Sequence, residues 1–177
     1  IGESDMKVVR NLEKADEHGP GEPNSKALRM IHIQVAIEAP LSFWKEWDTY
    51  KVATVSNSTS TMHKIGSYEI TEECFEPKPS GGISPLINLN ALEAKRKEFN
   101  ETKDKDVWYD LIYGLPDSWL QTRMVDFNYA TLRNMVYWRK NHKQNCWSGK
   151  DNSEMENFIK WAKTLPYSEE LIFNESK

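Results

Sequence analysis

The segment from Lys51 to Lys64 gathers side chains that can bind an anion. Seven of the eight residues from Thr54 to Thr61 carry a hydroxyl or an amide, and His63 follows them. Hydroxyl groups and loop N–H groups donate hydrogen bonds to phosphate oxygens, and lysine adds a point charge. A phosphate site follows if the loop curls so that these donors converge. The other interpretation is a solvated Ser/Thr loop, which composition alone favours.

A second group of cations lies near the end of a helix expected over 129–142. The cations of this group are Arg133, Arg139, Lys140, His142 and Lys143. The chain has a net charge of −4, so a basic cluster this dense calls for a counter-charge, and phosphate is one. The alternative is that the cations complement the helix dipole, which is worth ~0.3–1 kcal/mol for each residue. The residues alone do not decide between the two.

Other kinds of chemistry lack the spacing that they need. The four histidines form no H-x-x-x-H or H-E-x-x-H pattern, and Cys74 and Cys146 form no C-x-x-C pattern, so no metal is expected. The chain has no glycine-rich phosphate loop of the G-x-x-x-x-G-K-[ST] or G-x-G-x-x-G type. Ser58 and Ser60 lack the G-x-S-x-G turn of a nucleophile. No catalytic residue is assigned.

Charge and hydropathy limit the partners and the location. Net charge −4 argues against binding of duplex nucleic acid, which requires a basic face. No apolar run approaches the ~18 residues of a membrane span, so no membrane partner is expected. Two free thiols fit a reducing compartment, which favours the cytoplasm of a bacterium or an infected host cell. The chain begins at Ile1 rather than Met, so we expect an N-terminal segment to be missing.

Periodicity and turn signals predict the elements that position these residues. Apolar and polar side chains alternate over 30–38 and again over 121–127, which indicates two strands. Pro40 ends the first strand and suits the first turn of a helix, and Asn128 can cap the helix after the second. Helices are expected over 5–15 (capped by Ser4), 41–51, 84–102, 104–115, 129–142 and 153–165, and loops over 18–24, 54–61 and 66–83. The prediction is an α+β fold in one domain over 1–177.

Two of these segments, in this order and spacing, resemble the flavin-dependent thymidylate synthases. The strand over 30–38, the Ala39-Pro40 turn and an aromatic helix match the stretch before the family's R-H-R-x7-S signature. Thr49-Tyr50-Lys51 and then Thr59 take the register of that signature. Residues 127–133 resemble the family's L-N-A-R-S-L-R helix start, and Arg139 stands where that helix carries its next arginine. The resemblance covers residues 25–65 and 118–165 and is closest to a small, divergent phage branch.

The resemblance implies mixed helices with a small antiparallel sheet, and a homotetramer with nucleotide sites between subunits. It implies FAD as the cofactor and no protein nucleophile. The signature is altered in this chain, because Thr49 and Tyr50 are uncharged and Lys51 lacks the guanidinium fork. Asn57 stands near the position of a family acid. Residues 143–147 lack the arginine of the family's A-Q-x-E-I-R stretch.

We therefore predict a nucleotide-binding protein on this fold, such as a phage protein that sequesters or senses a nucleotide, rather than a conventional synthase. The predicted binding residues are Tyr50, Lys51, Asn57, Ser58, Thr59, Ser60, His63, Arg133, Arg139, Asn141 and His142. One alternative is an active FAD-dependent thymidylate synthase that methylates dUMP with methylenetetrahydrofolate and NADPH. The second alternative is a non-catalytic structural or interaction protein.

Overall fold

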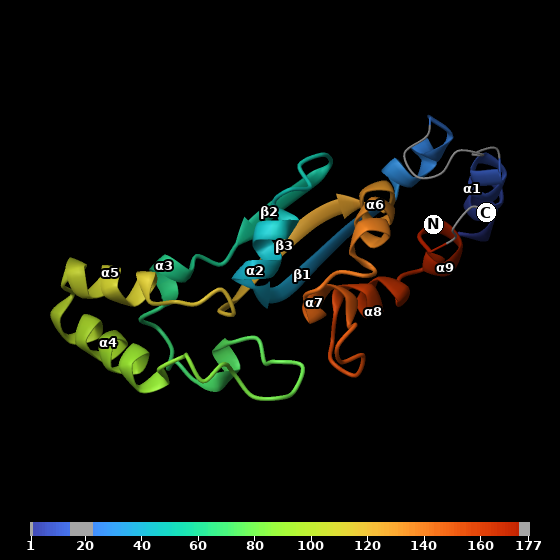
Figure 1. The fold of residues 1–177 in the computed structure, drawn as a ribbon. Helices are drawn as coiled ribbons and strands as arrows, with labels where there is room; N and C mark the ends of the chain where they lie inside the picture. The colour runs from blue at the N-terminus through green and yellow to red at the C-terminus, as the bar shows by residue number, and fades with distance from the viewer. Residues whose placement is uncertain (1, 15–22, 174–177) are drawn as a thin grey trace. The chain divides into compact units, whose positions relative to one another are not determined.

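The computed structural model describes residues 2–14 and 23–173. They form an α+β fold with a three-stranded antiparallel sheet in the order β1-β3-β2 (Figure 1). The strands are β1 (His32–Pro40), β2 (Thr54–Ser58) and β3 (Leu120–Asn128). The α-helices are α1 (Glu3–Lys14), α2 (Leu41–Trp47), α3 (Thr61–Lys64), α4 (Leu89–Thr102), α5 (Lys105–Tyr113), α6 (Tyr129–Arg139), α7 (Asn145–Ser148), α8 (Phe158–Lys163) and α9 (Ser168–Leu171), and the 3-10 helices are η1 (Pro23–Met30) and η2 (Glu72–Cys74). The predicted fold class is confirmed.

The chain divides into two compact units, which are described separately below. The first unit comprises Ile1–Val35, Thr49–Ser56 and Met124–Lys177. The second unit comprises Ala36–Asp48 and Asn57–Arg123.

The two strands predicted from alternation are both present. In β1, Ile33 is buried while His32 and Gln34 are exposed, as a half-buried strand requires. β1 ends at Pro40, which is the N-cap residue of α2. β3 runs to Asn128, whose side chain accepts a hydrogen bond from the Thr131 N–H at 3.0 Å and so caps α6 as predicted.

Helix α2 carries the aromatic core of the second unit but is shorter than predicted. Phe43, Trp44 and Trp47 are each at most 2% exposed. The prediction that this helix continues to Lys51 is wrong, because it ends at Trp47 with Asp48 as its C-cap. The Arg123 guanidinium donates to the Asp48 carboxylate at 2.9 Å and lies 4.4 Å from the Trp44 ring centroid. This ion pair is a tertiary contact that the helix pattern does not reveal.

The hydroxyl-rich segment is only partly the loop that its composition predicts. Thr54–Ser58 forms β2, at one end of the strand order, and Val55 is 70% exposed. Thr59 extends the pairing, since its N–H donates to the Thr122 carbonyl at 3.0 Å and its hydroxyl to the same oxygen at 2.9 Å. β-branched and polar side chains suit a strand that is solvated on both faces, so the loop prediction is wrong for these residues.

Helices α4 and α5 of the second unit lie side by side as a hairpin (Figure 1). Asn88 caps α4 and Asp104 caps α5 through hydrogen bonds from their first-turn N–H groups. Ser84-Pro85 therefore does not open the first of these helices, which begins at Leu89. The buried cluster beside them consists of Ile65, Ile70, Phe75, Leu111 and Trp119.

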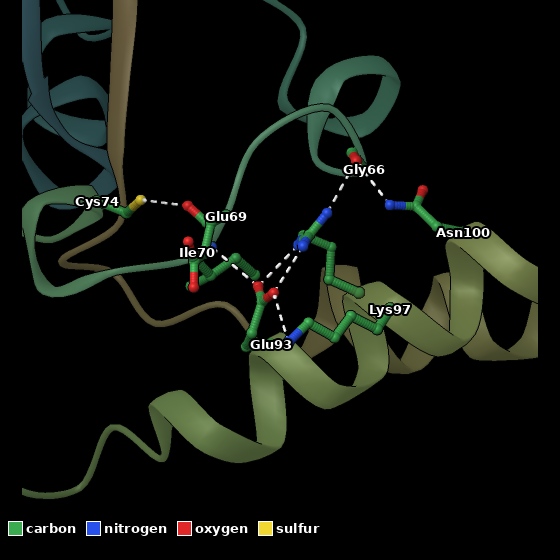
Figure 2. A network of polar contacts seen from close by, with 8 residues as sticks. Gly66, Glu69, Ile70, Cys74, Glu93, Lys97 and Asn100 are labelled. Atoms are coloured by element: carbon green, nitrogen blue, oxygen red, sulfur yellow. Dashed lines mark hydrogen bonds and ion pairs between the residues drawn. The ribbon is translucent and has the colours of Figure 1, made fainter.

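A polar network ties the 66–70 loop to α4 (Figure 2). The Glu93 carboxylate accepts two hydrogen bonds from Arg96, at 2.6 and 2.7 Å, and one from the Ile70 N–H at 3.0 Å. The Gly66 carbonyl accepts from Arg96 at 3.1 Å and from Asn100 at 2.8 Å. The hydrogen bonds from Arg96 hold the pKa of Glu93 at about 2, below its ordinary 4.5.

A Glu93→Gln variant is expected to lose about 2 kcal/mol of stability at pH 7, because hydrogen bonds to a charged acceptor at a largely covered site are the strong ones. The pKa of Glu93 is lowered by folding, so its stabilisation is complete above pH 4.5 and is lost as the pH falls toward 2. Urea unfolding at pH 7 and pH 3 measures both effects. The difference in the free energy of unfolding between the variant and the wild type should be smaller at pH 3 than at pH 7. The exposed Glu73 provides a Glu→Gln control, and equal midpoints for Glu93→Gln and wild type at pH 7 would refute the assignment.

The first unit differs from the predictions mainly at helix ends. α1 begins at Glu3, so Ser4 lies inside the helix rather than capping it. In the predicted loop over 18–24, residues 18–22 lie outside the described part of the chain, while 23 and 24 begin η1. The helix predicted over 153–165 is limited to α8. The Asn157 side chain caps α8 by accepting from the Lys160 N–H at 2.9 Å, which fixes its start.

Candidate functional site

The first unit contains a cleft of about 440 Å³ beside the start of α6. Its walls come from the end of η1, from the segment after α2, and from the first two turns of α6. The lining residues are Arg29, Thr49, Tyr50, Lys51, Val52, Ala53, Asn128, Ala130, Thr131 and Asn134. This volume falls within the range typical of small-molecule sites.

The segment 49–53 is held against α6 by hydrogen bonds between residues far apart in the sequence. The Thr131 hydroxyl donates to the Val52 carbonyl at 3.3 Å. Ala53 has φ +56°, a left-handed conformation that turns the chain into β2. Because Asn128 also caps α6 at this point, the same few residues end β3, start α6 and form the floor of the cleft.

Tyr50 is oriented by Arg139 at the end of α6. The Arg139 Nε donates to the Tyr50 hydroxyl at 2.8 Å, and the guanidinium carbon lies 5.4 Å from the Tyr50 ring centroid. The same guanidinium lies 5.2 Å from the ring centroid of buried Trp147. The hydrogen bond to Tyr50 and the cation–π contact with Trp147 hold the arginine, and the arginine in turn orients the tyrosine ring. Arg139 thus acts as a positioning residue for the cleft.

Two cations line the cleft, and only Lys51 was predicted from the sequence. Lys51 and Arg29 are both exposed. Arg29 was missed because it lies far from both predicted segments and no motif marks it. Thr131 and Asn134 were also missed. Their spacing along α6 puts them on one helix face, and this register could have revealed them.

The structure places the other predicted residues of the first unit outside the lining of this cleft. Arg133 is only 6% exposed and lies among the buried residues of α6. The His142 Nδ1 accepts from the Gln144 N–H at 3.2 Å, and its ring packs edge-on against Trp147. Asn141 is exposed beyond the end of α6. Their roles in binding stay predictions.

The predicted residues of the second unit lie at β2 and α3. Asn57 and Ser58 are exposed on β2, and the Thr59 hydroxyl is engaged by the Thr122 carbonyl. Ser60 occupies the N-cap position of α3, but its side chain makes no capping hydrogen bond, and His63 is exposed. A role for these residues in the same site as Lys51 stays a prediction.

A larger hollow of about 1060 Å³ in the first unit is a less suitable nucleotide site. Its walls are mostly apolar, from Val8, Leu12 and Met30 among others. Its polar edge is satisfied internally, because Asp126 accepts from Gln34 at 2.8 Å and faces the His32 Nδ1 at 3.0 Å. The hydrogen bond from Gln34, then that with His32, lowers the pKa of Asp126 below its ordinary value.

Across residues 2–14 and 23–173, no cluster of three or more histidine, cysteine, aspartate or glutamate side chains could hold a metal ion. Cys74 and Cys146 are not joined in a disulfide. None of the helices in this part of the chain has the length and apolar character needed to cross a bilayer.

Sequence comparison finds no protein-family model and no curated protein that matches this chain. Solved structures do match. Thymidylate synthase X (ThyX) from Helicobacter pylori, solved with FAD and dUMP, superposes with a TM-score of 0.63 at 15% identity, covering 96% of this chain and 91% of that one. The chain has the ThyX fold. The UMP/dUMP methylase PolB from Streptomyces cacaoi, solved with 5-Br UMP, gives a TM-score of 0.55 at 14% identity, covering 97% of this chain and 83% of PolB. At these identities the ThyX likeness establishes the fold alone.

Proposed function

We propose that this chain binds a mononucleotide of the UMP or dUMP kind in the cleft at the start of α6. The observation that carries the proposal is the meeting of Lys51, Arg29 and the oriented ring of Tyr50 in one cleft of about 440 Å³. The fold adds support, because ThyX and PolB were solved with dUMP and a brominated UMP on the same scaffold.

The cleft offers a separate partner for each part of a mononucleotide. Lys51 and Arg29 supply charge for the phosphate, and arginine can hold two phosphate oxygens at once. Thr131 and Asn134 supply a hydroxyl and an amide for the sugar or the base. These groups account for the binding of a mononucleotide, and no catalytic residue is assigned among them.

FAD is the cofactor that the fold implies, and the residues of this cleft do not fit it. The cleft lining offers two cations, Lys51 and Arg29, which together serve one phosphate group and leave no further cation for the second phosphate of a dinucleotide. Arg139 is engaged with Tyr50 and Trp147. Within one protomer, the cleft of about 440 Å³ is near the lower end of the ligand-site range and is small for a dinucleotide with a three-ring flavin.

The proposed role is therefore to sequester or sense a nucleotide, as a phage protein in the cytoplasm would. A homotetramer, with pockets completed by neighbouring subunits, is part of the proposal. Light scattering that returns a mass near 20.6 kDa would contradict the oligomer.

The second candidate is an active FAD-dependent thymidylate synthase, which is favoured by the fold of a protein solved with FAD and dUMP. The purified protein decides between the two. After incubation with FAD and gel filtration, a retained flavin absorbance band supports the synthase, and a colourless protein supports the binding protein.

Calorimetry with UMP, dUMP, a nucleoside diphosphate and a cyclic nucleotide tests the proposed function. We expect saturable heat for at least UMP or dUMP, and affinity that falls with added salt because charge dominates the phosphate contact. No heat for any member of the panel would contradict nucleotide binding and favour a structural or interaction protein.

A further inference from the structure

One face of α6 continues from the cleft to an exposed tryptophan. Thr131 and Asn134 line the cleft, and Trp138 follows Asn134 by four residues. Residues four apart on a helix are neighbours on its surface. Trp138 therefore stands on the same face, one turn beyond the last cleft residue of the helix.

Helix geometry directs the indole back toward the cleft. Long side chains on a helix point toward its N-terminus and cover the turn that precedes their own Cα. The turn preceding Trp138 contains Asn134, and one turn rises only ~5.4 Å. A ligand that lies along Asn134 is thus within reach of the indole.

The packing of Trp138 does not explain why this position is a tryptophan. It is 65% exposed, whereas the other tryptophans, all of which lie in the described residues, are buried or half-buried. Its neighbour Tyr137 meets it edge-on, with ring centroids 5.1 Å apart and an interplanar angle of 89°. This contact limits the motion of the indole and leaves most of its surface open. A large, restrained and solvated aromatic ring is suited to stacking.

We propose that Trp138 is the platform on which the base of the bound nucleotide stacks, and this rests on the proposed function. With the phosphate at Lys51 and Arg29, the sugar and base extend along α6 past Asn134 to Trp138. Every nucleobase has a π face, so stacking accepts any of them. The site then recognises nucleotides as a class. Its affinity differs more between a nucleotide and a sugar phosphate than between nucleotides with different bases.

The test compares Trp138→Ala and Trp138→Phe with the wild type, using UMP, dUMP and ribose 5-phosphate as ligands in calorimetry. Trp138→Ala should weaken UMP and dUMP binding roughly 5- to 150-fold, the range for loss of one base–aromatic stack. Trp138→Phe keeps a ring and should recover most of the affinity. Binding of ribose 5-phosphate, which has no base, should be equal in all three proteins.

Tyr113→Ala is the matched control, because Tyr113 is an aromatic residue of the second unit that is 79% exposed. It should bind UMP as the wild type does. UMP affinity unchanged in Trp138→Ala, or equal losses for UMP and ribose 5-phosphate, would overturn the stacking role while nucleotide binding stands. A wild-type protein that binds none of the three ligands would instead overturn the proposed function on which the stacking role rests.

Discussion

A Lys51→Glu variant is expected to lose at least about 100-fold in affinity for UMP or dUMP. A hydrogen bond to a charged group contributes ~1.5–3 kcal/mol, which is roughly 10- to 150-fold in affinity. The glutamate adds repulsion of the phosphate at the same position, so the loss should approach or exceed the upper figure. Lys51 is exposed, and its replacement should leave the unfolding temperature close to that of the wild type.

Two further variants separate the effect of the charge at position 51 from the effect of net charge. Lys78→Glu changes the net charge equally, but at an exposed turn of the second unit that does not line the cleft. It should leave binding within about twofold of the wild type, since exposed charges outside the site are screened. Lys51→Arg keeps the charge and should bind UMP at least as tightly, because a guanidinium can hold two phosphate oxygens. If Lys51→Glu and Lys78→Glu bind UMP equally, the phosphate does not lie at Lys51.

The elements with strong local signals were the ones predictable from the sequence. Alternation predicted β1 and β3, and Asn128 predicted the start of α6, because each signal depends on residues close together in the chain. β2 escaped prediction because an edge strand solvated on both faces has no apolar alternation. Its existence depends on pairing with β3, which is distant in sequence.

Part of the candidate site was also predictable, because its signal depends on residues close together in the chain. Tyr50 and Lys51 were found through the register of the family signature, and they line the cleft. Arg139 was predicted to bind the ligand, and this stays a prediction. In the structure it makes a hydrogen bond to Tyr50 and packs on Trp147. That role depends on where α7 brings Trp147, and α7 was not predicted. Likewise, Arg29 reaches the cleft only through the path of η1.

A Gly149→Ala variant is expected to cost about 3 kcal/mol, enough to lower the unfolding temperature of a chain this size by roughly 10 °C. Gly149 has φ +66°, and its N–H donates to the Asn145 carbonyl at 2.8 Å to end α7. A Cβ would lie 2.5 Å from the Asn157 Nδ2. Asn157 cannot easily move, because it is 8% exposed and its amide donates to the Met155 carbonyl at 3.0 Å while capping α8.

A Gly82→Ala variant separates the two causes of that loss, which are the backbone strain and the contact of the added Cβ with Asn157. Gly82 has φ +62°, nearly the conformation of Gly149, but no atom beyond its chain neighbours lies within 4 Å of where its Cβ would be. Gly82→Ala should therefore show the backbone strain alone, about 1 kcal/mol, and a correspondingly small shift on thermal unfolding. Equal shifts for the two variants would mean that the contact with Asn157 carries no cost. A larger shift for Gly149→Ala should also come with weaker UMP binding, because Trp147, two residues earlier, supports the arginine that orients Tyr50.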